Sequence, residues 1–256
     1  MFSDKKFFAI LRIVSDNIRK SFSWLFYSGL GIYTFVFFSA LHQKNRILDI
    51  GIEYTCADVF TECLSKYYVY LFFLPLGLFI RQRIIGNSEN IQLYLRYGKR
   101  SSIWKNNVLY SIIISFIYSF IIIVVIYISS LMLCRTAINW NTINSVYYMS
   151  CGDTNEQINF VEIILISFLY LYITMLSVNI VMQIAEVYSK VFGWLLVIVY
   201  IGLNMRGPLA FCRYNIDYLS YNNIWQFLLL QFIKIIVAVS AYFAGKIIIR
   251  KKDFYE

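Results

Sequence analysis

The residues of this chain that could act on another molecule are concentrated in one basic segment, residues 81–107. Six lysines and arginines stand there against a single acid, Glu89, so the segment holds a charge of +5 out of the chain's formal +9. Residues 90–97 have the spacing of a short helix with one apolar face, and Gly98 follows as a stop signal. The face consists of Ile91, Tyr94 and Leu95. We expect this segment to be a docking handle for a separate soluble protein; the alternative is a loop whose charges only orient the neighbouring segments in a membrane.

A second set of chemically capable residues lies inside long apolar runs. Lys234 stands near the middle of the last run, where a lysine costs about 2.5–3.5 kcal/mol in a bilayer, and Gln231 precedes it by three residues. Asn179 and Gln183 are four residues apart in an earlier run. We expect these four to face a transport pathway or a helix interface. For Lys234 snorkelling towards the membrane surface is the alternative, and for the amides hydrogen bonding between helices is favoured over substrate contact.

Residue patterns typical of catalysis are missing from the sequence. It has no phosphate-binding G-x-x-x-x-G-K-[ST] loop, no H-E-x-x-H and no G-x-S-x-G. The single histidine, His42, has no companions at metal-ligand spacing. We therefore expect no enzyme, no catalytic residues, no bound metal and no cofactor on this chain.

The elements that position these residues follow from composition. The chain is 60% hydrophobic and 14% charged, with a mean hydropathy of +0.64, which is too apolar for a soluble protein of 256 residues. The apolar runs are continuous and about twenty residues long, which favours membrane helices over the alternating strands of a barrel. The positive charges cluster beside the runs, so we attribute them to membrane flanks and expect no nucleic-acid partner.

The fold class that we predict is an all-α polytopic membrane protein with a single domain, residues 1–256. Residues 1–20 have the pattern of an amphipathic helix that lies on the membrane surface, the alternative being an extension of the first span. The loops predicted on the external side of the membrane are residues 42–66, 135–159 and 206–224, and residues 81–107 form the predicted cytoplasmic loop. Six spans are predicted, at about 21–41, 67–85, 108–134, 160–187, 191–205 and 225–249.

The distribution of positive residues predicts how the spans are oriented. With six spans, both termini, residues 81–107 and Lys190 fall on one side, which holds sixteen lysines and arginines against six on the other. Positive residues are retained in the cytoplasm, so we expect both termini and the basic segment to be cytoplasmic.

All five cysteines fall in or beside the loops predicted to be external, where an oxidising compartment favours disulfides. Pairs Cys56–Cys63 and Cys134–Cys151 would each close one loop and leave Cys212 unpaired. The connectivity stays open, and five small apolar residues without any disulfide are the alternative.

The layout resembles the permease subunits of type-2 ABC exporters along the whole chain. An interfacial N-terminal helix leads into six spans, a basic loop with a short helix joins spans two and three, and a tight turn joins spans four and five. The stretch LRYGKRSSIWKNN, residues 95–107, is similar to a loop common in small permeases of this family from Gram-positive bacteria. External cysteines are not expected from the family.

The resemblance implies a function. The short helix would dock on an ATP-binding cassette ATPase, with Arg96, Lys99 and Arg100 at the contact beside the apolar face. ATP and magnesium would be bound by that partner, and a second permease copy, identical or not, would complete the transporter. The expected setting is a bacterial plasma membrane and its lipids, and the expected activity is export of an amphipathic peptide, lipid or drug, with bacteriocin or lantibiotic immunity as the leading case. The alternative is a non-transporting sensor or assembly subunit with the same fold.

Overall fold

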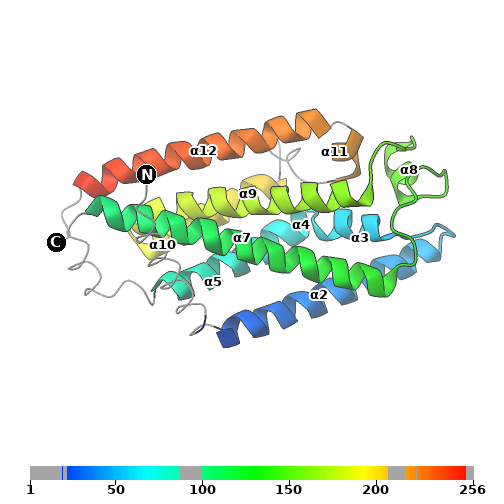
Figure 1. Ribbon diagram of the computed structural model, residues 1–256, viewed down its shortest axis with the longest axis horizontal. Coiled ribbons are helices and arrows are strands. Elements are labelled where there is room, and N and C mark those ends of the chain that lie inside the picture. The colour runs from blue at the N-terminus through cyan, green and yellow to red at the C-terminus, as the bar shows by residue number, and fades with distance from the viewer. Residues whose placement is uncertain (1–18, 20–21, 87–99, 207–216, 223, 252–256) are drawn as a thin grey trace.

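The computed structural model describes residue 19 and residues 22–86, 100–206, 217–222 and 224–251. The described residues are helical and contain no strand; a single isolated bridge joins Glu53 and Ser145. Figure 1 shows them as one elongated bundle of roughly parallel and antiparallel helices. The predicted all-helical architecture is confirmed for this part of the chain. The predicted surface helix, residues 1–20, lies outside it except for Arg19.

The long elements follow the apolar runs of the sequence. Helices within lipid bond every backbone group internally, which is why uninterrupted apolar runs adopt them. The bundle contains the following long helices in chain order: α2 (Phe22–Leu48), α5 (Leu74–Gly86), α7 (Arg100–Leu133), α9 (Phe160–Glu186), α10 (Lys190–Arg206) and α12 (Ile224–Lys251).

Three of these helices are long and apolar enough to cross a membrane, over Trp104–Leu133, Phe160–Glu186 and Phe227–Ile249. A fourth crossing is present if the bent pair Cys56–Cys63 and Lys66–Ile84 is one span. The described helices thus indicate a membrane protein with three to four candidate spans, and the predicted number of six is not confirmed. Residues Lys190–Met205, predicted as the fifth span, form a shorter apolar helix.

The second predicted span, residues 67–85, and the loop predicted before it both differ from the expectation. Residues 42–66 were expected to be an external loop, but α2 continues to Leu48 and a buried helix, α3 (Cys56–Cys63), follows. A break at residues 64–65 with a 49° bend leads into α4 (Lys66–Tyr68), a π-helical turn η1 (Val69–Phe73) and then α5. The acidic residues of α3 misled the prediction because they are hydrogen-bonded inside the protein, Asp58 to Trp140 and Tyr218 and Glu62 to Tyr54.

Helix α9 is the central element, and it packs against α7, α10 and α12. Two glycines allow close approaches at its neighbours. A Cβ on Gly77 of α5 would stand 2.6 Å from the ring of Tyr118, and a Cβ on Gly245 of α12 would stand 2.2 Å from the ring of Trp104. Both rings therefore pack directly on a helix backbone, which no larger residue would permit without displacement.

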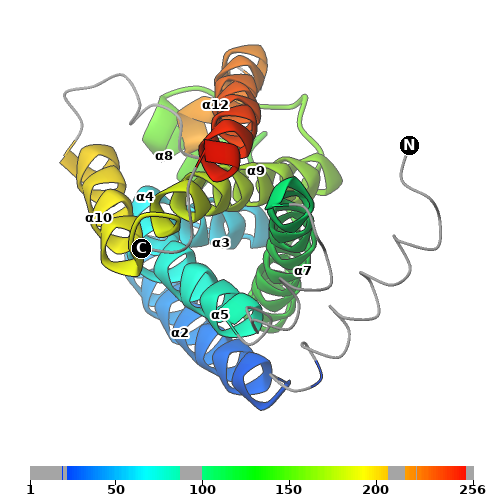
Figure 2. The ribbon, with the colours of Figure 1, turned by 90° about the vertical axis from the view of Figure 1, so that its left-hand side faces the viewer.

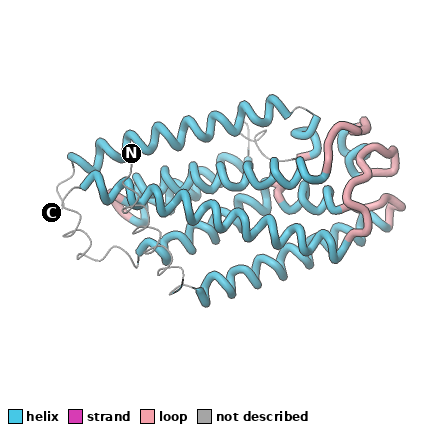
Figure 3. Tube along the Cα trace, in the orientation of Figure 1, coloured by secondary structure: helices cyan, strands magenta, loops and turns pink. Residues whose placement is uncertain are grey.

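The helix ends separate into two groups (Figure 1). At one end of the bundle, here called the handle end, α5 and α9 finish, α7 and α10 begin, and α12 finishes. At the other end, here called the cap end, the short helices α3, α8 (Val146–Cys151) and α11 (Tyr218–Asn222) gather with the longest described loops (Figure 3). The two described ends of the basic segment, the end of α5 and the start of α7, lie at the handle end.

Candidate functional site

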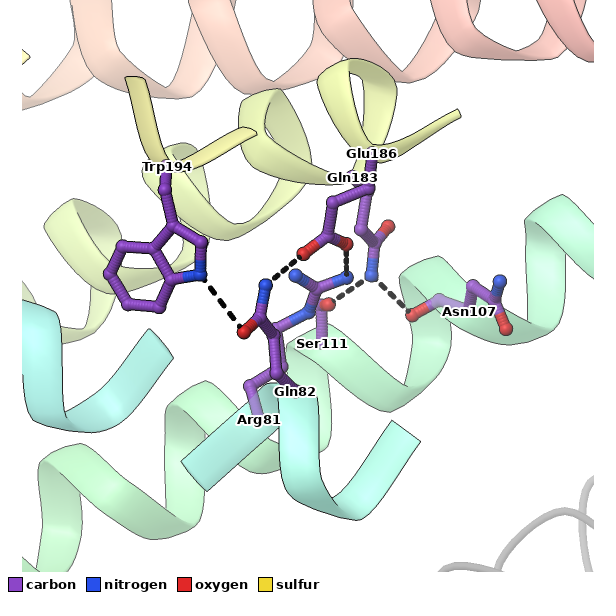
Figure 4. A network of polar contacts seen from close by, with 7 residues as sticks. All are labelled: Arg81, Gln82, Asn107, Ser111, Gln183, Glu186 and Trp194. Atoms are coloured by element: carbon purple, nitrogen blue, oxygen red, sulfur yellow. Dashed lines mark hydrogen bonds and ion pairs between the residues drawn. The ribbon is translucent and has the colours of Figure 1, made fainter. Parts of the chain in front are cut away.

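A buried polar network at the handle end joins four helices (Figure 4). Arg81 of α5 is 2% exposed and pairs through Nη2 with Oε2 of Glu186 at the end of α9, at 2.9 Å. Among the described residues, Nε and Nη1 of Arg81 have no hydrogen-bond partner. A buried guanidinium with one acceptor is only partly satisfied, so its position depends strongly on Glu186.

Gln82, the next residue of α5, extends the network to α10. Its Nε2 donates to Oε1 of Glu186 at 2.7 Å, and its Oε1 accepts a hydrogen bond from Nε1 of Trp194 at 3.1 Å. The Gln82 side chain thus donates to a residue of α9 and accepts from a residue of α10 at the same time. The two ends of the tight turn at residues 187–189 are thereby tied to the residues that open the basic segment.

A ladder of polar side chains joins α9 to α7 immediately beside this network (Figure 4). Gln183 donates from Nε2 to the carbonyl oxygen of Asn107 at 3.0 Å and to the hydroxyl of Ser111. One turn further into the bundle, Asn179 donates to Oγ of Ser115 at 2.7 Å. Residues four apart lie on one helix face, so the two pairs stack along the α7–α9 contact. Both amides thus form hydrogen bonds between α9 and α7.

A second site lies near the middle of the bundle, where Lys234 of α12 meets α9. Its ammonium donates to Oγ1 of Thr174 at 3.0 Å and stands 4.7 Å from the centre of the Tyr170 ring. Hydroxyls and aromatic faces both stabilise an ammonium that has lost water. No carboxylate of the described residues forms an ion pair with Lys234.

The cap end is organised around the carboxylate of Asp58, which is fully buried in α3. It accepts hydrogen bonds from the backbone N–H of Thr55 at 2.8 Å, from the Thr55 hydroxyl at 2.7 Å, from Nε1 of Trp140 at 2.9 Å and from the Tyr218 hydroxyl at 3.3 Å. Four donors replace the water that the charge has lost. The cluster fastens the loop after α7 and helix α11 onto α3, which makes it a structural element.

The predicted disulfides are wrong for the described cysteines, which are all free. Cys56 and Cys63 occupy opposite ends of α3, and a rise of about 1.5 Å per residue separates them by more than the roughly 7 Å that a disulfide tolerates. Cys56 instead donates to the carbonyl oxygen of Ser130 at 3.6 Å and lies beside Cys134. Cys151 has Tyr147 of its own helix as a neighbour. Cys212 lies outside the described residues.

The predicted docking residues lie outside the part of the chain whose side chains the structure describes. Ile91, Tyr94, Leu95, Arg96 and Lys99 lie outside the described residues, and Arg100 is the first residue of α7, with no side chain described. The basic segment therefore remains a prediction for residues 87–99. Its two ends are in the structure, as the end of α5 and the first turns of α7.

The four predicted pathway residues separate into two places. Asn179 and Gln183 face α7, whereas Lys234 and the buried Gln231 lie on α12, and Lys234 contacts the opposite side of the α9 helix. Sequence reasoning missed the ion pair of Arg81 with Glu186 and counted Arg81 only among the charges of the basic segment. The four-residue spacing of Ser111 and Ser115 was a readable signal for the α7 side of the ladder.

The groups that the described residues bring together at these sites are hydrogen-bonding amides and hydroxyls, an arginine–glutamate ion pair and a lysine. In this part of the chain no group of three or more His, Cys, Asp or Glu side chains could hold a metal ion. Comparisons with protein-family models, with curated proteins and with solved structures find no match to this chain.

Proposed function

We propose that this chain is the transmembrane permease subunit of an ATP-binding cassette exporter. In this proposal six segments span a bacterial plasma membrane, namely α2, the bent unit α3–α5, α7, α9, α10 and α12, with both termini in the cytoplasm. The chain itself would bind no nucleotide. ATP and magnesium would be held by separate ATPase subunits, and a second permease copy would complete the transporter.

The observation that carries the proposal is the polar network at the handle end. It lies where the basic segment meets the bundle, and it bonds the end of α5 to the α9–α10 turn through Arg81, Gln82 and Glu186. The polar ladder bonds the start of α7 to α9. A force applied to residues 87–99 would thus reach α9 from both ends of the segment at once.

The central position of α9 explains how such a force would change the bundle. α9 packs against α7, α10 and α12, so its displacement alters three helix contacts together. Buried ion pairs and amide ladders hold discrete arrangements, because intermediate positions leave buried polar atoms without partners. The network is suited to switch the bundle between two states when an ATPase dimer closes and opens.

The amphipathic class of cargo is supported by the site around Lys234. It combines one cation with apolar helix surfaces inside a candidate span. A peptide, lipid or drug with an apolar part and a charged part matches this combination, and immunity to membrane-active peptides is the biological role we favour for it.

The test is affinity purification of the tagged chain from its native membranes, followed by assay of vanadate-sensitive ATP hydrolysis. We expect a cassette ATPase to co-purify, and we expect Arg96→Glu with Arg100→Glu to remove it. Lys44→Glu with Arg135→Glu reverses two charges at the other end of the bundle and is the matched control. Retained ATPase with the first pair, or loss with the second, contradicts the proposal.

A second arm tests the network itself. Glu186→Gln should leave the ATPase bound but reduce the stimulation of ATP hydrolysis by cargo, because the connection from α5 to α9 is weakened. Glu156→Gln, in an exposed loop at the cap end, should change neither property. Equal stimulation in both variants would refute the role of the network in coupling.

A further inference from the structure

A cavity of about 200 Å³ lies between α9, α10 and α12. Its walls come from all three helices and are almost entirely aliphatic: Val178, Val181 and Met182 of α9, Leu196 and Val197 of α10, and Val237 of α12. Apolar cavities of about 150 Å³ stay dry and accept small apolar molecules. The space therefore suits a segment of hydrocarbon chain and is too small for a folded peptide.

The cavity is reachable from the side of the bundle. α10 and α12 both pack on α9 and lie apart from one another beside it (Figure 2). Residues of all three helices line the cavity. Val237 is 46% exposed although it lines the cavity, which places the rim on the outer surface of α12. A chain dissolved in the surrounding lipid could enter there without unfolding any helix.

A cation stands one helical turn from this cavity. Lys234 precedes Val237 by three residues on α12, and its partner Thr174 precedes the lining residue Ser177 by three residues on α9. Positions three apart are neighbours on a helix face. The contact between the ammonium and the Thr174 hydroxyl therefore forms one end of the cavity region.

The ammonium retains capacity for an anionic ligand. It has three donors, of which one is used by Thr174, and the face of Tyr170 covers one side of it. Among the described residues no carboxylate pairs with it. A cation kept in an apolar span without a protein counter-charge is suited to bind a negative group brought by a ligand.

Tyrosine hydroxyls add a polar wall at the same level. Tyr200 lines the cavity, and its ring lies edge-on to the buried ring of Tyr70, with centroids 5.8 Å apart. The Tyr70 hydroxyl lies close to those of Tyr170 and Tyr200. The region therefore changes from a largely aliphatic cavity to a polar and cationic surface within about one helical turn.

We propose that this region is a binding site for an amphiphile with one hydrocarbon chain and one anionic head group. The chain occupies the cavity between α9, α10 and α12, and the head group pairs with Lys234 beside Thr174. A carboxylate and a phosphate share this chemistry, so a fatty acid and a lysophospholipid are the two sources to distinguish. Calling the ligand a cargo rests on the proposed transport function, whereas the binding itself does not.

The experiment uses the full chain alone, in nanodiscs of neutral phosphatidylcholine, with palmitic acid that bears a photoreactive diazirine in mid-chain. We expect crosslinks on the cavity-lining residues of α9, α10 and α12. Unlabelled palmitate should compete, while hexadecanol, which lacks the charge, and acetate, which lacks the chain, should not. Competition by lysophosphatidic acid equal to or stronger than that of palmitate identifies a phosphate head group, and weaker competition identifies a carboxylate.

Matched variants distinguish an effect of the Lys234 charge on labelling from an effect of misfolding. Lys234→Gln should weaken labelling roughly tenfold, the loss expected for one charged hydrogen bond, while Lys234→Arg should largely retain it. Lys246→Gln, on the same helix near the handle end, is the control and should label like the original chain. Val197→Trp fills the cavity and should abolish labelling; the elution volume in size-exclusion chromatography verifies folding.

Three results would contradict the proposed binding site. They are crosslinks spread evenly over lipid-facing residues, equal competition by hexadecanol and palmitate, and full labelling of a folded Lys234→Gln variant. Because the assay contains no ATPase, failure here leaves the proposed function standing. Conversely, failure of an ATPase to co-purify with the chain would leave this binding site standing.

Discussion

Neutralising Glu186 tests whether the handle-end network holds the bundle together. In Glu186→Gln the Arg81 guanidinium, 2% exposed, loses the negative charge of its ion pair, and the one remaining oxygen at position 186 has to serve both Arg81 and Gln82. Nε and Nη1 of Arg81 already have no hydrogen-bond partner among the described residues. Removing one member of a buried pair typically costs 3–5 kcal/mol. Glu186 is itself 18% exposed, so water replaces part of the loss, and we expect a cost at the low end, about 3 kcal/mol.

The assay is thermal unfolding of the purified chain in detergent, followed by tryptophan fluorescence. For a chain of this size a loss of 1 kcal/mol lowers the melting temperature by about 2–4 °C, so about 3 kcal/mol corresponds to a decrease of roughly 6–12 °C. Glu156→Gln removes the same charge from an exposed loop and should change the melting temperature by no more than about 2 °C.

A double variant checks that the loss comes from the uncompensated charge. Arg81→Met removes the guanidinium, and Arg81→Met with Glu186→Gln leaves neither charge buried while Gln82 keeps an acceptor on α9. The double variant should recover most of the stability that Glu186→Gln loses, because paired removal of buried charges is often neutral. A melting temperature in Glu186→Gln within 2 °C of the original, or additive losses in the double variant, would refute the reasoning.

Three further predictions concern packing and the cap end. Gly245→Ala places a methyl group against the ring of Trp104 and should destabilise the chain by about 1–3 kcal/mol in the same assay, whereas Gly202→Ala, with open space around it, should not. Trp140→Phe removes a donor from a buried carboxylate and should cost about 1–3 kcal/mol, while Trp225→Phe, at an 84% exposed position, should be neutral. The intact mass of the chain under denaturing conditions should not change on reduction, since the described cysteines are free; a gain of two hydrogens would contradict this.

The long helices could be predicted because their cause is local. Apolar runs with few prolines and glycines bond their own backbone in lipid, so α7, α9 and α12 appear where the runs are. Their ends were harder to predict. α7 begins at Arg100 where the span was expected from residue 108, because Trp104 donates to the carbonyl oxygen of Tyr242 and the carbonyl oxygen of Asn107 accepts from Gln183 within the bundle. Helix α3 was missed for a similar reason, since its buried acid, Asp58, accepts hydrogen bonds from residues distant in sequence.

The sequence by itself determined the helical class, the membrane character and the identity of the unusual polar residues within apolar runs, because these depend on composition and spacing along one chain. Only the tertiary structure decided their partners. Arg81, noted first as one charge of a basic segment, is paired with Glu186 at a separation of 105 residues, and Lys234 meets Thr174 at a separation of 60. Such contacts arise from the way helices pack, and no local pattern specifies which helix faces which.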